Sequence, residues 1–298
     1  MNYLITGATG FVGRALVSRL LDGGHTVNYL ASKRSKDLDG RAAFHSWERG
    51  QNPSLNSIPR LDTVVNLAGE PIAQRWTEQV KRRIHDSRVD GTRRLVASIA
   101  ELRHKPTVLI SASAVGYYGD RGEEVLTEQS GPGKDFLADV CVGWEREALR
   151  ARELGLRVVL LRIATVLGRG GGALKSMAAP FRLGIGGRFG NGRQWMPWIH
   201  LDDLVRLIVF AAEHQDVEGP LNACSPESVT NRQFTEALAH ALHRPALFPA
   251  PKFALKAILG EMSDFLFESE HVIPEAAVRS GFKYEHGQLD GALRDSLR

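Results

Sequence analysis

The sequence predicts an α/β protein built on a doubly wound parallel sheet. Short runs of apolar and β-branched residues recur along the 298-residue chain, and helical patterns separate them. A glycine triplet also follows the first run directly. Strands that alternate with helices favour parallel pairing, because the connecting helix crosses back over the sheet.

The individual elements follow from these runs. Apolar runs expected to form strands lie at residues 3–6, 27–31, 63–68, 107–111 and 157–163. Helices are expected at 14–21, where Gly23-Gly24 ends the pattern, and at 78–102 and 136–154. The last three strand runs are continuously apolar, which is typical of strands buried on both faces.

Beyond Val166 the composition changes. Residues 168–176 and 181–198 are rich in glycine, with Trp and Arg between the glycines. A helix is expected at 200–214 and a strand at 220–224. From about Thr230 the chain looks helical, with a proline-rich joint at 245–253. We therefore predict a sheet domain over 1–225, with a substrate-side loop inserted at about 168–200, and a small, mainly helical C-terminal domain over 226–298.

Composition excludes several classes of protein. Hydrophobic residues make up 43% and charged residues 24%, and the net charge is +4 with the Lys and Arg residues dispersed. This disfavours a nucleic-acid surface. Two distant cysteines argue against a disulfide scaffold or structural zinc and fit a reducing compartment. The start of the chain does not resemble a signal peptide, and residues 205–212 are too short to span a bilayer. We expect a cytoplasmic protein that does not use a membrane.

The stretch GATGFVG places Gly7, Gly10 and Gly13 between the first strand and the first helix. The first glycine allows a tight turn, the second lets backbone N–H groups approach a pyrophosphate, and the third lets helix and strand pack closely. The alternative is a simple tight turn, but a dinucleotide-binding motif requires this position in a Rossmann-type sheet. We predict a dinucleotide cofactor.

The loop after the second strand indicates which dinucleotide. An acid about 20 residues after the glycines would bind a ribose 2′-hydroxyl and favour NAD. Within residues 29–37 no acid precedes Asp37, and Lys33 and Arg34 occupy the loop. Two cations suit a 2′-phosphate, so NADP(H) is the predicted cofactor.

Further motifs give these observations a family context. They are NLAGEPI (66–72), SASAVGYYGD (111–120), LGRGGG (167–172), PFRLGIGG (180–187) and PWIHLDD (197–203). With GATGFVG they resemble the short-chain dehydrogenase/reductase superfamily, in its extended and atypical branches. The narrower resemblance is to an epimerase-like group, described as nucleoside-diphosphate-sugar epimerases, that ends in a domain of unknown function. It covers nearly the whole chain.

The resemblance implies cofactor contacts. These are Gly7, Gly10, Phe11, Val12 and Gly13 at the pyrophosphate, Lys33 and Arg34 near the adenosine ribose, and Leu67, Ala68 and Gly69 along the cofactor's path. The family's arginine after the second strand aligns with Ser32, so the phosphate contact is displaced by one or two residues. The resemblance also allows a homodimer.

The superfamily's catalytic residues are only partly present. The resemblance implies that Ser113, or its neighbour Ser111, polarises the substrate. It further implies a Tyr and, one helical turn later, a Lys that favours the tyrosinate. Leu137 and Cys141 occupy those two positions. The usual acid/base pair is therefore absent.

Two tyrosines could replace the missing acid. Tyr117 and Tyr118 follow Ser113, and Arg121 lies four residues after Tyr117 as a cation that could lower its pKa. Packing against cofactor or substrate is an equally good interpretation of either ring. For Cys141, a buried helix cysteine is commoner than a nucleophile.

The segment 181–203 resembles the loop with which extended members hold nucleotide-sugar phosphates. Arg182, Arg188 and Arg193 could bind an anion there, and Trp195 and Trp198 offer flat apolar walls. A packed loop with surface arginines is the alternative. His-x-Asp-Asp at 200–203 is a weak metal pattern, and helix capping explains it better, so no metal is predicted.

Two functions fit this sequence. The first is an atypical NADP(H)-dependent oxidoreductase or epimerase-like enzyme acting on a small, nucleotide-linked or otherwise anionic substrate. The second is a catalytically silent NADP(H)-binding sensor or regulatory protein. Ser113 and the substrate-side loop favour the enzyme, whereas the loss of Tyr and Lys favours the sensor.

Overall fold

Seven parallel strands form the central sheet of the protein, in the order β10-β7-β5-β4-β1-β2-β3. The computed structural model describes residues 1–246, 249–250 and 252–298. In chain order the strands are β1 (Asn2–Thr6), β2 (Thr26–Ala31), β3 (Ala43–Ser46), β4 (Thr63–Asn66), β5 (Val108–Ala114), β7 (Arg157–Ile163) and β10 (Gly219–Ala223). The chain runs outward from β1 to β3 and then crosses to β4 to build the other half. This confirms the predicted doubly wound fold and places its switch point between β1 and β4.

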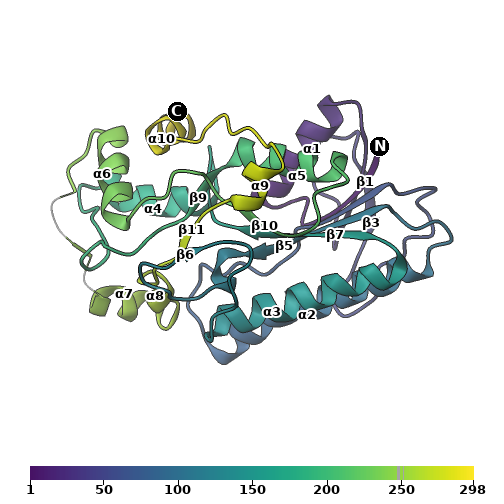
Figure 1. Ribbon diagram of the computed structural model, residues 1–298, viewed down its shortest axis with the longest axis horizontal. Coiled ribbons are helices and arrows are strands. Elements are labelled where there is room, and N and C mark those ends of the chain that lie inside the picture. Colours follow the sequence, from purple (N-terminus) through teal and green to yellow (C-terminus); the bar gives the residue numbers. More distant parts are fainter. Residues whose placement is uncertain (247–248, 251) are drawn as a thin grey trace.

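Helices cover both faces of the sheet (Figure 1). One face carries α1 (Phe11–Asp22) and α5 (Leu201–Glu213), and the other carries α2 (Glu78–Glu101) and α3 (Phe136–Leu149). On β1 the side chains alternate between the layers, because Tyr3 and Ile5 join the core with α1 and α5, whereas Leu4 joins the core with α2. Burial on both faces explains why the strand sequences are continuously apolar.

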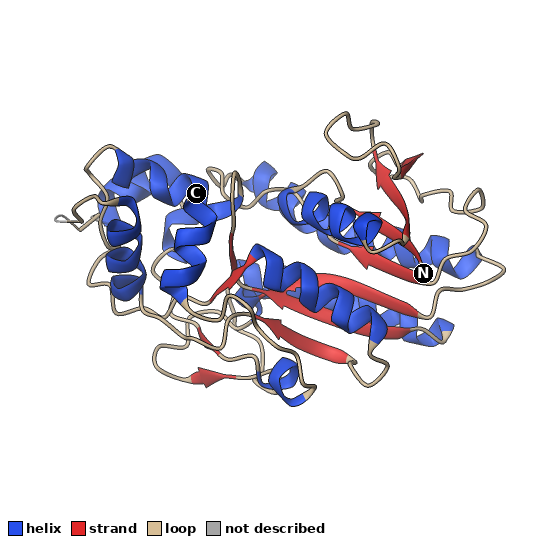
Figure 2. Ribbon diagram, turned by 90° about the horizontal axis from the view of Figure 1, so that it is seen from above, coloured by secondary structure: helices blue, strands red, loops and turns tan. Residues whose placement is uncertain are grey.

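A second group of helices lies at the carboxyl end of the sheet, on the left in Figures 1 and 2. It contains α4 (Gly172–Arg182), α6 (Asn231–Leu242), α7 (Lys252–Leu259), α8 (Met262–Phe265) and α10 (Leu289–Leu297). Phe181, Trp198 and Phe234 are buried in its core. This is the smaller lobe that the sequence predicts.

Two small parallel sheets connect the lobe to the main sheet. In one, β8 (Thr165–Leu167) pairs with β9 (Trp198–His200), and in the other, β6 (Val125–Leu126) pairs with β11 (His271–Val272). After β11 the chain forms α9 (Glu275–Arg279), and Ala277 and Phe282 enter the core beneath α1 and α5. The boundary at 225/226 stays a prediction, and residues from beyond it complete the core of the sheet.

Some elements differ from the sequence expectation. The edge strand β3 was not expected, and its sequence AFHS lacks a continuous apolar run. Helix α4 lies where a glycine-rich loop was expected, since Gly171 caps it without a side chain and Pro180 lies inside it. Of the proline-rich joint at 245–253, residues 247–248 and 251 lie outside the described residues.

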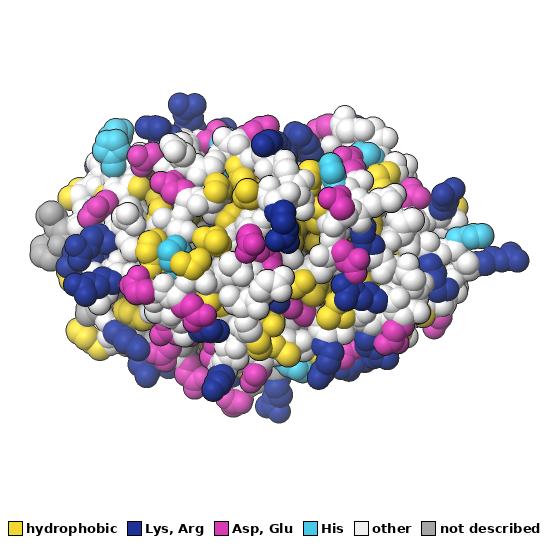
Figure 3. Space-filling model, viewed as in Figure 1, with side chains coloured by type: hydrophobic (Ala, Val, Ile, Leu, Met, Phe, Trp, Pro, Cys, Tyr) yellow, Lys and Arg dark blue, Asp and Glu magenta, His cyan; other side chains and the backbone are white. Residues whose placement is uncertain are grey.

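The surface carries mixed charge. On the face drawn in Figure 3, basic and acidic side chains are interspersed rather than gathered into separate regions. Within the described ranges, no helix combines the length and the hydropathy that a membrane span requires.

Candidate functional site

The glycine loop between β1 and α1 is too tight for side chains. Gly7 has φ +69°, and a Cβ added to it would lie 2.6 Å from the carbonyl carbon of Leu67. A Cβ on Gly13 would lie 2.2 Å from the Gly7 oxygen. Gly10 caps α1 with no side-chain hydrogen bond, so the first backbone N–H groups of the helix remain available to an anion. The residues present therefore fit a bound pyrophosphate.

Two strand ends meet beside this loop. Thr6, at the end of β1, donates to the Oδ1 atom of Asn66 at 2.7 Å and accepts from the backbone N–H of Ala68 at 3.1 Å. The segment 67–69 therefore lies beside the glycine loop. Its place along the cofactor's path, which the family resemblance implies, stays a prediction. Gly69 is exposed there.

Phe11 connects the glycine loop to α4. Its half-buried ring lies against Gly168, Gly171 and Gly172 of the LGRGGG motif. A Cβ added to Gly171 would lie 2.5 Å from its nearest neighbouring atom, and one added to Gly168 or Gly172 would lie 2.7 Å away. At Gly171 and Gly172 that neighbour is the Phe11 ring itself. The LGRGGG motif thus packs against the start of α1, beside the glycine loop, and this role could not be predicted from the sequence.

The loop after β2 leaves its cations accessible. Lys33 and Arg34 are both exposed, directly beyond the strand that pairs with β1. The backbone N–H of Ser35 donates to the Tyr29 hydroxyl at 3.2 Å, which ties the loop to its strand. Both side chains are free to reach a ligand that extends from the glycine loop.

Ser113, near the end of β5, lies in a buried polar network. Its hydroxyl donates to the Oε1 atom of Glu145 at 2.7 Å. Arg162 on β7 pairs with both oxygens of the same carboxylate, at 2.9 and 3.0 Å. All three residues are buried, Ser113 being 3% exposed. The hydroxyl proposed to polarise a substrate is therefore oriented by a carboxylate that is itself charge-paired.

Tyr117 and Tyr118 occupy different environments. The Tyr118 hydroxyl is buried, donates to the Oδ1 atom of Asn222 at 2.6 Å and accepts from Arg162 at 3.0 Å. Its burial raises its pKa well above the usual range. Tyr117 is half-buried, and the Arg162 guanidinium lies 3.5 Å above its ring centroid. Of the two tyrosines, Tyr117 is therefore the less buried.

The cation at these tyrosines is not the one expected from the sequence. Arg121 is bound to the carboxylate of Glu124, with N–O distances of 2.7 and 2.9 Å. Arg162, from the neighbouring strand β7, lies against both rings instead. Its position inside the strand, after the apolar run VVLL (158–161), is a sequence signal, because a charged residue in a buried strand requires a partner.

Leu137 and Cys141 both lie on the buried face of α3. Leu137 packs against Gly116, since a Cβ added to Gly116 would lie 3.4 Å from the Cβ of Leu137. Cys141 neighbours Ser113 and Ala114, and burial raises the pKa of its thiol to about 12. The thiol is therefore neutral at pH 7, which fits a packing role rather than that of a nucleophile.

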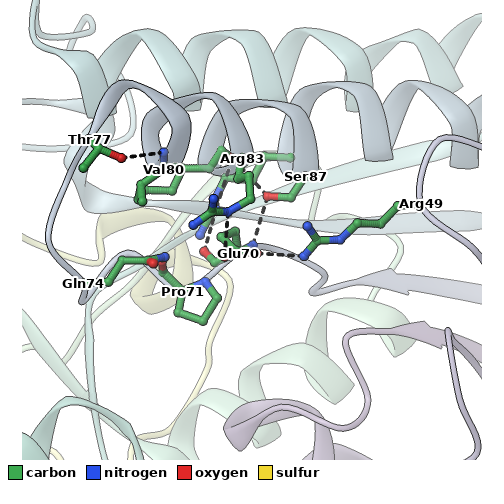
Figure 4. A network of polar contacts seen from close by, with 10 residues as sticks. Arg49, Glu70, Pro71, Gln74, Thr77, Val80, Arg83 and Ser87 are labelled. Atoms are coloured by element: carbon green, nitrogen blue, oxygen red, sulfur yellow. Dashed lines mark hydrogen bonds and ion pairs between the residues drawn. The ribbon is translucent and has the colours of Figure 1, made fainter.

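The loop after β4 is held to α2 through Glu70 (Figure 4). Arg49 lies 2.7 Å from one carboxylate oxygen and Arg83 lies 3.4 Å from the other. These contacts lower the pKa of the Glu70 carboxyl, and the hydrogen bond from Arg49 has the largest effect. The Glu70 backbone N–H donates to Ser87 at 2.9 Å. The loop beside Gly69 is therefore fixed at both backbone and side chain.

The residues predicted on the substrate side are dispersed. Arg182, Arg188 and Arg193 are exposed, the first in the last turn of α4 and the others in the following loop. Trp195 is half-buried, stacks on His271 at 3.8 Å and donates to Glu123 at 2.8 Å. Trp198 is fully buried in the core of the lobe, so it forms no wall of an open surface.

The His-x-Asp-Asp motif has structural partners. The His200 side chain caps α5 by accepting from the backbone N–H of Asp202 at 3.3 Å. The buried Asp203 carboxylate accepts from the backbone N–H groups of Glu285 and His286, both at 2.8 Å. In the described part of the chain, the one group of metal-ligating type is Asp202, Glu285 and His286. Glu285 also pairs with Arg206 at 3.2 Å.

Comparison with solved structures places this fold among epimerases. The crystal structure of human epimerase family protein SDR39U1 (isoform 2) with NADPH superimposes with a TM-score of 0.89, at 33% identity, over 99% of both chains. A UDP-glucuronic acid 4-epimerase from Bacillus cereus, solved with UDP-glucuronic acid and NAD, gives a TM-score of 0.79 over 99% of this chain and 98% of its own. At 18% identity that second likeness shows the fold alone.

Sequence comparison identifies the family. The chain is 40% identical to the chloroplastic SDR39U1 homologue of Arabidopsis thaliana, over 99% of this chain and 86% of that protein. It is 37% identical to the epimerase family protein YfhF of Bacillus subtilis, over 98% and 97%. A domain of unknown function, DUF1731, matches residues 250–296, and the NAD dependent epimerase/dehydratase family matches residues 3–224. As its motifs predict, the chain belongs to the NAD dependent epimerase/dehydratase family, in the epimerase-like group that carries this C-terminal domain.

Proposed function

We propose that the protein is an NADP(H)-binding oxidoreductase or epimerase-like enzyme that works without the usual Tyr–Lys pair. The observation that carries the proposal is the N-terminus of α1, where Gly10 provides no side-chain hydrogen bond to the first backbone N–H groups. The close packing at Gly7 and Gly13 leaves no room for a Cβ in the loop before it. Lys33 and Arg34, exposed beyond the neighbouring strand, suit a 2′-phosphate. The NADPH in the crystal structure of the human relative supports the same cofactor.

The proposed chemistry is redox exchange with a small, nucleotide-linked substrate. When bound, the nicotinamide would supply or accept hydride. Ser113, oriented by Glu145, would position the reacting oxygen, and the Tyr117 hydroxyl would move the proton. The exposed side chains of Arg182, Arg188 and Arg193 would attract an anionic substrate.

The alternative is a catalytically silent NADP(H)-binding sensor. A specific observation favours it, namely that the hydroxyl groups of Ser113 and Tyr118 already donate to Glu145 and Asn222. A site whose polar groups satisfy one another can bind a cofactor without acting on a substrate.

Cofactor preference tests the first part of the proposal. NADPH should bind more tightly than NADH. Arg34→Ala should lower the ratio of the two affinities by about tenfold, because one charge-assisted contact to the 2′-phosphate is lost. The measurement is a fluorescence titration with each cofactor. Lys36→Ala, which removes an exposed cation from the same loop, is the matched control. Equal affinities of the native protein for the two cofactors would contradict the 2′-phosphate assignment.

Turnover separates the enzyme from the sensor. A metabolite screen with NADPH and with NADP⁺, followed by nicotinamide absorbance, should reveal a substrate. Ser113→Ala should then slow that reaction by about 10²-fold or more and leave NADPH affinity unchanged. Unchanged turnover in the variant would remove Ser113 from the mechanism, and silence across the screen would favour the sensor.

A further inference from the structure

The segment between α8 and β11 (Figure 1) contains two acidic side chains that the proposed function does not use. Glu268 is half-buried, and Glu270 is buried with only 5% of its surface exposed. Each has a buried carboxyl oxygen with no hydrogen-bond partner among the described residues. Because burying a carboxylate is costly unless it is paired or hydrogen-bonded, we looked for the partner that these two groups would take.

Backbone hydrogen bonds hold this segment between two loops at the carboxyl end of the sheet. The N–H of Ser269 donates to the Asp120 carboxylate at 3.1 Å, and its carbonyl accepts from the N–H of Arg121 at 3.0 Å. On the other side, the Ser269 hydroxyl accepts from the N–H of Trp195 at 3.0 Å. The N–H of Glu270 donates to the Trp195 carbonyl at 3.2 Å. The two acids are therefore fixed beside the loop that the sequence assigns to the substrate.

Two further acids bring negative charge to the same place. Burial raises the pKa of both Glu268 and Glu270, and repulsion from Asp135 and Asp120 adds to the effect. Asp135 caps α3 through its Oδ1 atom. Its Oδ2 atom lies against Gly119, where an added Cβ would be 2.5 Å away. These four residues, here called the acidic cluster, gather negative charge at the start of α3, and the buried carboxyl of Glu270 faces the other three.

The acidic cluster borders the candidate catalytic site. Asp135 comes two residues before Leu137, which occupies the position that the family resemblance assigns to the catalytic tyrosine. A Cβ added to Gly116 would lie 3.4 Å from Leu137 and 3.9 Å from Phe265, the last residue of α8. Glu268 follows three residues later. A molecule held by the acidic cluster would therefore lie near the end of β5.

The cations of the neighbouring segments are engaged elsewhere. Arg121 pairs with Glu124 at 2.7 Å, and Lys252 pairs with Asp264 at 2.9 Å. No arginine or lysine contributes to the pKa of Glu268 or Glu270 in the part of the chain that the structure describes. The acidic cluster thus lacks a cation of its own.

The spacing of the acids favours an organic cation over a metal ion. Ca²⁺ and Mg²⁺ bind oxygen atoms at about 2.0–2.6 Å, so their ligand atoms must lie close together. Within the described ranges, no three of these acids bring ligand oxygens within 4.8 Å of one another. An ammonium group accepts carboxylates at about 2.8 Å and needs no closed shell of ligands. We propose that Glu268 and Glu270 bind the ammonium group of a small organic molecule. This inference does not depend on the cofactor.

A titration with a diamine tests the assignment. Calorimetry of the cofactor-free protein at pH 8 should detect binding of 1,4-diaminobutane, but not of 1,4-butanediol, which has the same chain without the charges. Glu268→Gln and Glu270→Gln keep the size of the side chain and remove its charge. Each should weaken diamine binding about tenfold or more, because a charge-assisted contact is lost. Glu275→Gln, which changes an exposed acid beyond β11, should leave the affinity unchanged.

The outcomes separate this inference from the proposed function. A native protein that does not bind the diamine, or variants that bind it as tightly as the native protein, would overturn the site. Binding of Ca²⁺ in place of the diamine would indicate a metal site and overturn the organic ligand. If neither variant folds, hydrogen exchange of the native protein decides. The diamine should slow exchange of the backbone N–H groups of residues 268–272, and unchanged exchange there would contradict the assignment. Failure to bind NADPH would overturn only the proposed function, since the diamine titration contains no cofactor.

Discussion

Two neighbouring acidic side chains, Glu268 and Glu270, have limited contact with water, since Glu268 is half-buried and Glu270 is buried. Each has a buried carboxylate oxygen with no hydrogen-bond partner among the described residues. Burial, with repulsion from Asp135 and Asp120, raises the pKa of Glu268 to about 7. Burial and repulsion from Glu268 raise the pKa of Glu270 well above its usual range. The Glu268 carboxyl is therefore only partly ionised at neutral pH. Ionisation of either carboxyl opposes folding.

This arrangement predicts a pH dependence of stability. The folded-state pKa of Glu268 lies above its unfolded value of 4.5, so its contribution is fully present below about pH 4.5 and is lost as the pH rises through 7. Glu268→Gln stays neutral throughout. Its melting temperature should exceed that of the native protein by more at pH 8 than at pH 5. The exposed Glu153→Gln is the control, and a difference that does not change with pH would contradict the assignment.

At the residue scale, the sequence predicts residues whose role depends on local spacing, but not the partners that residues find through long-range packing. Gly7, Gly10 and Gly13 could be assigned from the sequence because a turn and a helix start are local features. The partner of Arg162 could not, since Glu145 belongs to another element and comes near only when α3 packs on the sheet.

At the scale of elements, the start of α4 and the start of α1 are packed as one unit. Phe11, the first residue of α1, fills the space that three glycines leave around the start of α4. The sequence predicted α1 because its apolar face is regular. It did not predict α4, because glycines replace the usual polar cap there. The start of α4 therefore has a packing contact with Phe11 where a side-chain cap is missing.

Substitution at this contact should be destabilising. A Cβ on Gly171 would lie 2.5 Å from the Phe11 ring, and φ is extended there, so the clash alone opposes Gly171→Ala. We expect a loss of about 1–3 kcal/mol in the free energy of unfolding. Phe11→Leu should recover part of it in the double variant, as measured by denaturant titration. Gly40→Ala, where a Cβ would meet nothing within 4 Å, should be nearly neutral, and an equal loss there would contradict the packing argument.

At the scale of the whole molecule, the C-terminal region is bound into the sheet domain. The Glu128 carboxylate accepts from the backbone N–H groups of Asn222, at 3.0 Å, and Ala276, at 3.2 Å. Asp203 holds Glu285 and His286 in the same manner. The family motifs predicted that this region accompanies the sheet, but contacts across 80 or more residues have no local pattern from which to infer them.

The buried network at Tyr118 determines when, during synthesis, the centre of the protein can finish folding. Arg162 and Glu145 can pair as soon as β7 joins the sheet, but the Tyr118 hydroxyl requires Asn222, which in turn donates to the backbone oxygen of Ile273 at 2.9 Å. A nascent chain still held at the ribosome before residue 273 therefore lacks the last acceptor of that network. The centre of the protein is completed by one of the last segments to be synthesised.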